Sequence, residues 1–151
     1  MDRQTFDKMP VTDARSCLAA VDGSRASIDA LIWTLRYATD HDLKVEVLTV
    51  WPPYESVLVR EVPGHFCAPR WSARAAQDEA VRQALEKVTE PPVIATSLEN
   101  ADVAQAITSA SARHELVVLG STPDKHRHRL TERIVEDAHC EVVVVESLAG
   151  T

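Results

Sequence analysis

The sequence Cys17-Leu18-Ala19-Ala20-Val21-Asp22-Gly23-Ser24 joins a short apolar run to a polar turn. Directly after it, apolar residues recur three and four positions apart from Ile28 to Ala38, which predicts an amphipathic helix from Arg25 to about His41. An apolar run without alternation, followed by a turn and a helix, is typical of a strand covered on both faces of a parallel sheet. This part of the chain therefore predicts the first strand–helix unit of an α/β fold.

The same alternation continues to the end of the chain. Further strands are predicted over residues 45–50, from 93, over 116–119 and over 142–145, with helices from Ser72 to before Pro91, from Asn100 to about 110, and from Leu130 to about His139. Ser72 and Asn100 are the expected N-caps of the second and third helices. His114 is expected just after the third helix, where the helix dipole favours a basic side chain. The pattern predicts one doubly wound, Rossmann-like α/β domain over residues 17–147, with a flexible extension at 1–16 and a short tail at 148–151.

Length and composition restrict the class of protein. The chain has 151 residues, of which 45% are hydrophobic and 26% charged, as in soluble single domains. Its formal net charge of −7 argues against binding to nucleic acid or to an anionic membrane. We find no apolar leader and no run near the roughly 20 residues that a membrane span requires. Three cysteines without CxxC spacing indicate reduced thiols, and we expect a cytoplasmic protein.

Ligands of doubly wound sheets bind beyond the carboxyl ends of the strands. Two turns are expected there: Asp22-Gly23-Ser24 after the first strand, and Gly120-Ser121-Thr122-Pro123 after the fourth. Asp and Ser also cap helices, and Gly also serves to turn a chain. Asp22 is therefore open to two interpretations, as a helix cap or as a ligand contact.

The motifs of catalysis are missing from both turns. No G-x-S-x-G elbow surrounds Ser24 or Ser121, and neither HExxH nor a Walker A loop occurs. His126 and His128 lack a second pair of ligands, so a metal site is not expected. We expect no enzymatic activity.

Several segments together resemble one family. Residues 20–24 read AVDGS, residues 48–51 read LTVW, residues 114–121 read HELVVLGS and residues 138–144 read AHCEVVV. In this order they are similar to the universal stress protein (UspA-like) family over about residues 17–146. The resemblance implies a five-stranded parallel sheet of order 3-2-1-4-5. It also implies a choice of activity, because some members bind ATP through Gly-x2-Gly-x9-Gly-Ser/Thr after the fourth strand and others lack that motif.

The glycine motif is not retained here. Gly120 supplies the first position, but the second is Pro123, which has no N–H to donate, and the last pair is Arg133-Ile134. Aligned backward from Cys140, residues 128–131 (HRLT) replace the usual Gly-Ser-Val-Ser, and the loop is about five residues short. The chain has only four glycines. We therefore predict a degenerate ATP-binding loop and no cofactor, and do not expect ATP.

The remaining segment, residues 124–129 (DKHRHR), is strongly basic. It can be interpreted as an anion site before a helix N-terminus or as a solvated surface turn. The candidate nucleotide- or anion-binding residues are Asp22, Gly23, Ser24, Val50, Gly120, Ser121, Arg127, Arg129 and Thr131.

Two functions follow. The first is a non-enzymatic stress-response protein that acts through contacts with an unidentified protein partner, without glycine-loop ATP binding. The alternative is a stress sensor that binds ATP, AMP or a cyclic nucleotide through Asp22 and the basic turn.

The apolar residues of the last predicted strand indicate an interface with another chain. In the implied order it lies at an edge, yet Val142, Val143, Val144 and Val145 are all apolar, which is a liability unless the edge is paired. The family commonly dimerises through this strand. We expect a homodimer with a two-fold axis near it.

Overall fold

A computed structural model describes residues 15–51, 68–122 and 125–147. It contains five strands and four helices: β1 (Ser16–Ala20), α1 (Arg25–His41), β2 (Lys44–Trp51), α2 (Ala68–Leu85), β3 (Ile94–Asn100), α3 (Val103–Ser111), β4 (Leu116–Ser121), α4 (Lys125–Asp137) and β5 (Glu141–Glu146). The flexible extension and the tail that the sequence predicts lie largely outside the described residues. The predicted alternation of strands and helices is confirmed.

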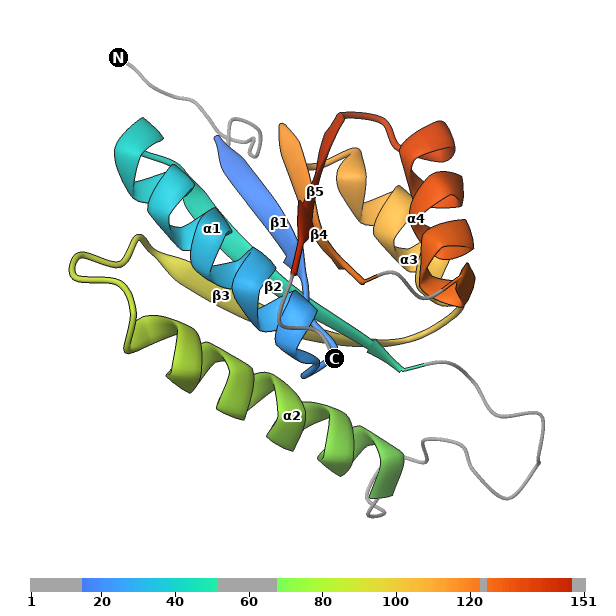
Figure 1. Cartoon of the computed structure of the whole chain (residues 1–151), viewed down its shortest axis with the longest axis horizontal. Coiled ribbons are helices and arrows are strands. Elements are labelled where there is room, and N and C mark those ends of the chain that lie inside the picture. The colour runs from blue at the N-terminus through green and yellow to red at the C-terminus, as the bar shows by residue number, and fades with distance from the viewer. Residues whose placement is uncertain (1–14, 52–67, 123–124, 148–151) are drawn as a thin grey trace, which may run out of the picture.

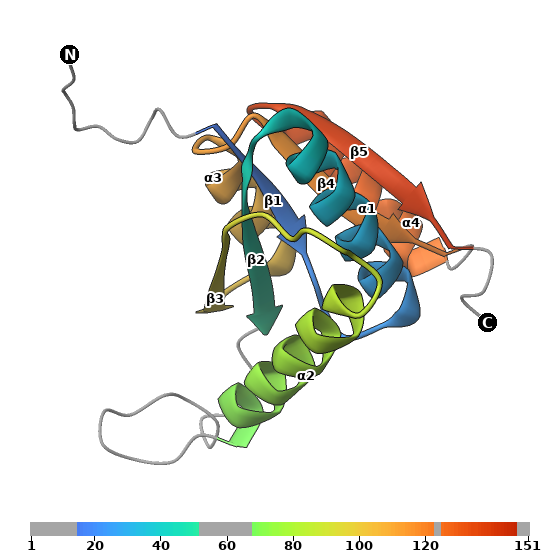
Figure 2. The same ribbon diagram turned by 90° about the vertical axis from the view of Figure 1, so that its left-hand side faces the viewer.

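The strands form one parallel sheet in the order β3-β2-β1-β4-β5, as the resemblance implies. Helices α1 and α2 cover one face, and α3 and α4 cover the other (Figures 1 and 2). Chain order reverses between β1 and β4, which are adjacent. The switch point therefore lies between the two turns that the sequence singles out.

Each face of the sheet has its own core. Leu31, Leu35 and Val47 belong to the core beneath α1 and α2, while Leu18, Leu48 and Ile107 belong to the core beneath α3 and α4. Successive residues of a strand point to opposite faces. A strand with a core on each side must be apolar at nearly every position, which explains the unalternated run in β1.

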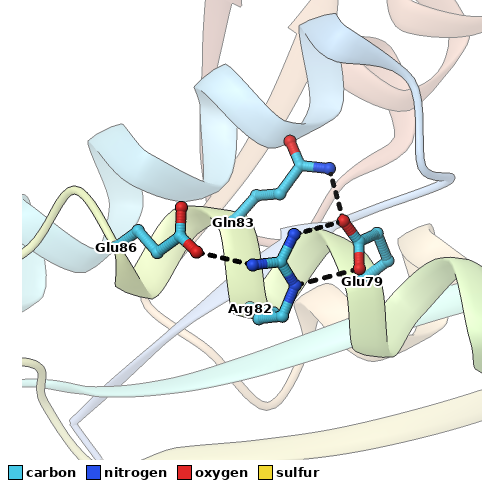
Figure 3. A network of polar contacts seen from close by, with 4 residues as sticks. All are labelled: Glu79, Arg82, Gln83 and Glu86. Atoms are coloured by element: carbon cyan, nitrogen blue, oxygen red, sulfur yellow. Dashed lines mark hydrogen bonds and ion pairs between the residues drawn. The ribbon is translucent and has the colours of Figure 1, made fainter.

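Helix α2 begins earlier than the sequence predicts. Its first residue is Ala68, so Ser72 lies inside the helix and the predicted N-cap is wrong. Pro69 fits in the first turn because the N–H that proline lacks has no partner there anyway. The outer face of α2 carries an exposed ionic network (Figure 3), in which Arg82 bonds to Glu79 at 2.6 and 3.0 Å and to Glu86 at 2.5 Å. Exposed pairs of this kind add little to stability.

The predicted cap of the third helix is also wrong. Asp102 is the N-cap, and its Oδ2 accepts a hydrogen bond from the Gln105 N–H at 3.0 Å. Asn100 is the last residue of β3, pairs with Trp51 of β2, and donates its side-chain amide to the Trp51 carbonyl at 3.0 Å. Pairing with β2 thus keeps Asn100 in the strand, and the helix begins two residues later.

Helix α4 begins at Lys125 and not near Leu130. Most of the basic segment predicted as a turn is therefore helical, because Lys and Arg favour helices and no glycine interrupts the run. Within the described part of the chain, no helix is long and apolar enough to cross a membrane.

Candidate functional site

A pocket of about 320 Å³ opens at the carboxyl ends of β1, β2 and β4, between the sheet and the helices α3 and α4. We call it the site pocket. Its lining residues are Ala20, Val21, Asp22, Ser27, Leu48, Val50, Val103, Ile107, Leu119, Gly120, Leu130, Thr131 and Ile134. The pocket lies where ligands bind in sheets of this type.

The turn after β1 is organised as a helix cap. Ser24 is the N-cap of α1, and its Oγ accepts a hydrogen bond from the Ser27 N–H at 3.2 Å. The Asp22 carboxylate accepts the Ser24 N–H at 2.9 Å, and Ser27 Oγ donates to the Ser24 carbonyl at 2.9 Å. The cap of α1 is therefore Ser24 and not Asp22, which supports the turn before the helix by accepting the N–H of the cap residue. Asp22 also lines the site pocket, and its contact with a ligand stays a prediction.

Gly23 has its own structural reason to be glycine. Its φ is +90°, which side-chain-bearing residues rarely adopt, and an added Cβ would lie 3.2 Å from the Cβ of Ala76 in α2. Gly23 does not line the pocket. Its role is to turn the chain beneath α2.

Gly120 is required by packing. A Cβ at this position would lie 2.3 Å from the carbonyl oxygen of Ala26 and 2.8 Å from the Ser27 nitrogen. Glycine thus lets β4 approach the backbone of the first turn of α1. This close approach explains Gly120 without any phosphate.

The structure brings together only part of the predicted set. Asp22, Val50, Gly120 and Thr131 line the site pocket, whereas Gly23, Ser24, Ser121 and Arg129 do not. Ser121 is buried, and its carbonyl accepts the Ser147 N–H at 3.1 Å. Arg129 is exposed on α4, and the side chain of Arg127 lies outside the described residues.

Apart from Val50, the apolar residues that line the pocket are not among the candidate site residues predicted from the sequence. Leu48, Ile107 and Ile134 are buried core residues, and they also line the pocket. Their positions are the available signal, since Leu48 lies beside the last residue of β1 and Ile107 and Ile134 lie on the inward sides of two helices. Only the packing of α3 and α4 shows that the space between them is left unfilled.

A second polar cluster lies away from the pocket. The two ring nitrogens of His114 contact Ser16 Oγ and Glu46 Oε1, both at 2.7 Å, and Glu46 Oε2 accepts a hydrogen bond from Ser97 Oγ at 2.7 Å. Hydrogen bonds from His114 and Ser97 and the charge of Arg113 lower the pKa of Glu46 to about 2, although burial opposes this shift. The cluster joins β1, β2, β3 and the segment before β4.

His114 therefore differs from its predicted role. It lies three residues beyond α3, and only 6% of its side chain is exposed. Ser, His and Glu are the residue types of a hydrolytic triad. Ser16, however, is itself only 6% exposed, so a substrate has no access to its hydroxyl group. The cluster is a structural connection.

The structure describes two free cysteines, Cys17 and Cys140. Cys17 is buried, and burial raises its pKa to about 12, which suppresses the reactive thiolate. Burial also raises the pKa of Cys140. Among the residues that the structure describes, no group of three His, Cys, Asp or Glu side chains could hold a metal ion.

Comparison with known proteins places this geometry in a family. A model of the universal stress protein family matches residues 14–146, whereas a search of curated proteins gave no match.

Three of the solved structures that share the fold are described here by their similarity to this chain. A universal stress protein family member from Burkholderia pseudomallei is 24% identical, with a TM-score of 0.59 and coverage of 91% of this chain and 100% of that chain. An AMP-bound family member from Arabidopsis thaliana is 19% identical (TM-score 0.62, coverage 89% and 93%), and a universal stress protein in complex with cAMP is 13% identical (TM-score 0.65, coverage 87% and 96%). The chain belongs to the universal stress protein family.

Proposed function

We propose that this chain is a non-enzymatic, cytoplasmic stress-response protein that acts through contacts with other proteins and does not hold ATP in a glycine loop. The observation that carries the proposal is the connection between β4 and α4. Strand β4 ends at Ser121 and α4 begins at Lys125, so only residues 122–124 connect them. A Gly-x2-Gly-x9-Gly loop has no room in three residues.

The chemistry of the connection supports the same proposal. A phosphate cradle needs several backbone N–H groups that can approach the anion closely. Pro123 has no N–H, and Gly120, the first position of the motif, is needed where β4 contacts α1. The residues that replace the last Gly-Ser pair belong to α4, whose backbone N–H groups beyond the first turn are bonded within the helix.

The hydrogen bonds among the polar groups at the start of α1 favour a protein without catalytic activity. Asp22, Ser24 and Ser27 form hydrogen bonds with one another at the start of α1. A nucleophile needs a direct hydrogen bond to its general base at an accessible site, whereas the described bonds of the Ser24 and Ser27 hydroxyl oxygens go to backbone groups.

The alternative is a nucleotide-binding sensor. It is favoured by the two relatives whose structures contain AMP and cAMP, and by the position of Asp22 in the site pocket. In this alternative the basic residues in the first turns of α4 replace the glycine loop.

A thermal-shift measurement separates the two functions. A nucleotide with a dissociation constant of about 10 μM, supplied at 1 mM, stabilises a protein by roughly 2.7 kcal/mol, which is a shift of roughly 5–10 °C for a domain of this size. We expect no shift with ATP, ADP, AMP or cAMP, with or without Mg²⁺. A shift that Asp22→Asn abolishes would overturn the proposal in favour of the sensor.

We further propose that β5 pairs with its counterpart in a second copy. β5 is an edge of the sheet, and 37% of Val144 is exposed in the single chain. An edge strand offers a row of backbone groups to a partner. Antiparallel pairing about a two-fold axis would cover both edges equally.

Light scattering tests this pairing. We expect Val144→Lys to give a monomer, because two lysines would face each other near the axis, and Val144→Pro to do the same by removing a backbone donor. Val93→Lys is the matched control, since Val93 is exposed beside the opposite edge strand. A dimer that survives both changes at position 144 in folded protein would refute the interface.

A further inference from the structure

The outer edge of β3 is unpaired. This strand ends the sheet on the side away from β5 (Figure 2), and among the residues that the structure describes no strand lies beyond it. Val45 of β2 is in register with Ile94, and its N–H bonds to the Val93 carbonyl at 2.9 Å. In a parallel ladder this pattern turns the backbone groups of the odd-numbered residues of β3 towards β2. The N–H and C=O groups of Ile94, Thr96 and Leu98 therefore point outward.

This edge lacks the features that usually protect an edge strand. Natural edges carry charges, prolines or bulges that block a further strand. Residues 94–98 (IATSL) contain neither a charge nor a proline, and all seven residues of β3 pair with β2 in one continuous register. Ala95 and Thr96 are exposed, and their short side chains leave the backbone accessible. The edge is therefore regular enough to accept a strand from another molecule.

An exposed apolar side chain lies beside the edge. Helix α2 is held to β3 by Gln77, whose side-chain amide donates to the Ser97 carbonyl at 2.7 Å. Ala76 faces the turn after β1, and Leu85, nine residues later, lies half a helical circumference away. Leu85 is thus on the flank of α2 turned towards the β3 edge, and it is 36% exposed. Every second side chain of an added strand would face α2, and an apolar residue there would cover Leu85.

The charge beside the edge indicates the chemistry of the partner. Glu99 is exposed on β3 and belongs to none of the described ion pairs. It lies on the side of the sheet opposite α2, because odd-numbered and even-numbered side chains of a strand alternate. A lysine or arginine across from Glu99 would form a favourable cross-strand pair. The formal net charge of −7 attracts a cationic partner over longer distances.

We propose that the β3 edge binds an extended segment of a partner protein, in which apolar side chains alternate with lysine or arginine. Backbone hydrogen bonds to Ile94, Thr96 and Leu98 supply the pairing, and contacts with Leu85 and Glu99 select the segment. The inference rests on the proposed function, because it names the surface for contacts with other proteins. A dimer through β5 leaves this surface open, since β3 and β5 are opposite edges of the sheet.

Hydrogen exchange in the full-length protein tests whether the edge is open. We expect the amides of Ile94, Thr96 and Leu98 to exchange at least about tenfold faster than those of Ala95 and Ser97, which donate to β2. Slow exchange at positions 94, 96 and 98 would show that a second copy or another segment of this chain already covers the edge. That result would overturn the inference.

Binding is tested with a blocked nine-residue peptide in which valine and lysine alternate. We expect it to change the amide NMR shifts along β3 and to protect the Thr96 amide from exchange, while the amides of Val143 and Val145 stay unchanged. The same peptide with a central proline, or with glutamate in place of lysine, should bind at least about tenfold more weakly. Equal binding by the glutamate peptide, or equal shifts along β5, would refute selection by Glu99.

Three variants locate the contact. Thr96→Pro removes an outward N–H and keeps the pairing with β2, so it should weaken peptide binding at least about tenfold. Glu99→Lys should weaken binding at least about threefold, whereas Glu136→Lys makes the same change of charge on the exposed side of α4 and should leave binding unchanged. The proline-containing peptide decides the role of the backbone even if Thr96→Pro fails to fold.

The outcomes separate this inference from the proposed function. If the valine–lysine peptide leaves the β3 amides unchanged, the inference fails, and the proposed function is still decided by the thermal shift with nucleotides. If a nucleotide stabilises the protein and Asp22→Asn abolishes the shift, the proposed function fails, whether or not the peptide binds.

Discussion

Replacing Gly120 by alanine is expected to lower the free energy of unfolding by more than about 3 kcal/mol, at or beyond the upper end of the usual cost of overpacking. The new Cβ would lie 2.3 Å from the Ala26 carbonyl oxygen and 2.5 Å from its carbon. Both atoms belong to the backbone of α1, which a side-chain rotation cannot move. Relief requires α1 to shift away from β4, and that shift disturbs the core around Leu31 and Val118.

Urea unfolding followed by circular dichroism measures this effect, with Gly23→Ala as the comparison. At Gly23 the expected cost is smaller, roughly 1–2 kcal/mol, because it arises mainly from a φ of +90° and from a 3.2 Å contact with the end of the short Ala76 side chain. An unfolding midpoint for Gly120→Ala within error of the parent would contradict the packing role. If Gly120→Ala lost nucleotide binding while its stability stayed unchanged, Gly120 would instead have a role in binding phosphate.

The second large effect concerns Glu46. Its pKa is about 2 in the folded protein and 4.5 without the fold, so folding favours the ionised form. The contribution of Glu46 to stability is therefore complete above about pH 4.5 and is lost as the pH falls towards 2. At 1.36 kcal/mol per pKa unit, the difference between 4.5 and about 2 amounts to at most about 3.4 kcal/mol.

Glu46→Gln isolates this contribution, because glutamine keeps the size of the side chain and has no carboxylate. We expect the stability difference between the parent and Glu46→Gln, measured in urea at a series of pH values, to shrink as the pH falls from 4.5 to 2. A difference that stays constant over this range would show that the Glu46 carboxylate is not the group responsible. His114→Ala should reduce the pH dependence in the same way, since the His114 hydrogen bond is the largest cause of the lowered pKa.

The order and type of the elements could be read from the sequence because hydrophobic periodicity is a local signal. Runs such as 17–21 and 142–145 predict strands, and the spacing from Ile28 to Ala38 predicts α1, which has the predicted bounds. The errors are at helix ends. Ser72 and Asn100 are plausible caps by residue type, but Pro69 allows α2 to start earlier and pairing with β2 holds Asn100 in β3.

The sequence by itself determined the family, the strand order that this family implies, and the absence of glycine between Gly120 and Gly150, because each depends on residue types in chain order. Only the tertiary structure decided why the two glycines near the site are there: one approaches the Ala26 backbone and the other turns beneath Ala76. It alone joined His114 to Glu46, which is 68 residues away. It also showed that Leu48, Ile107 and Ile134 line a pocket as well as a core. Contacts between distant residues and unfilled volume arise when elements pack, and no local pattern of residues encodes them.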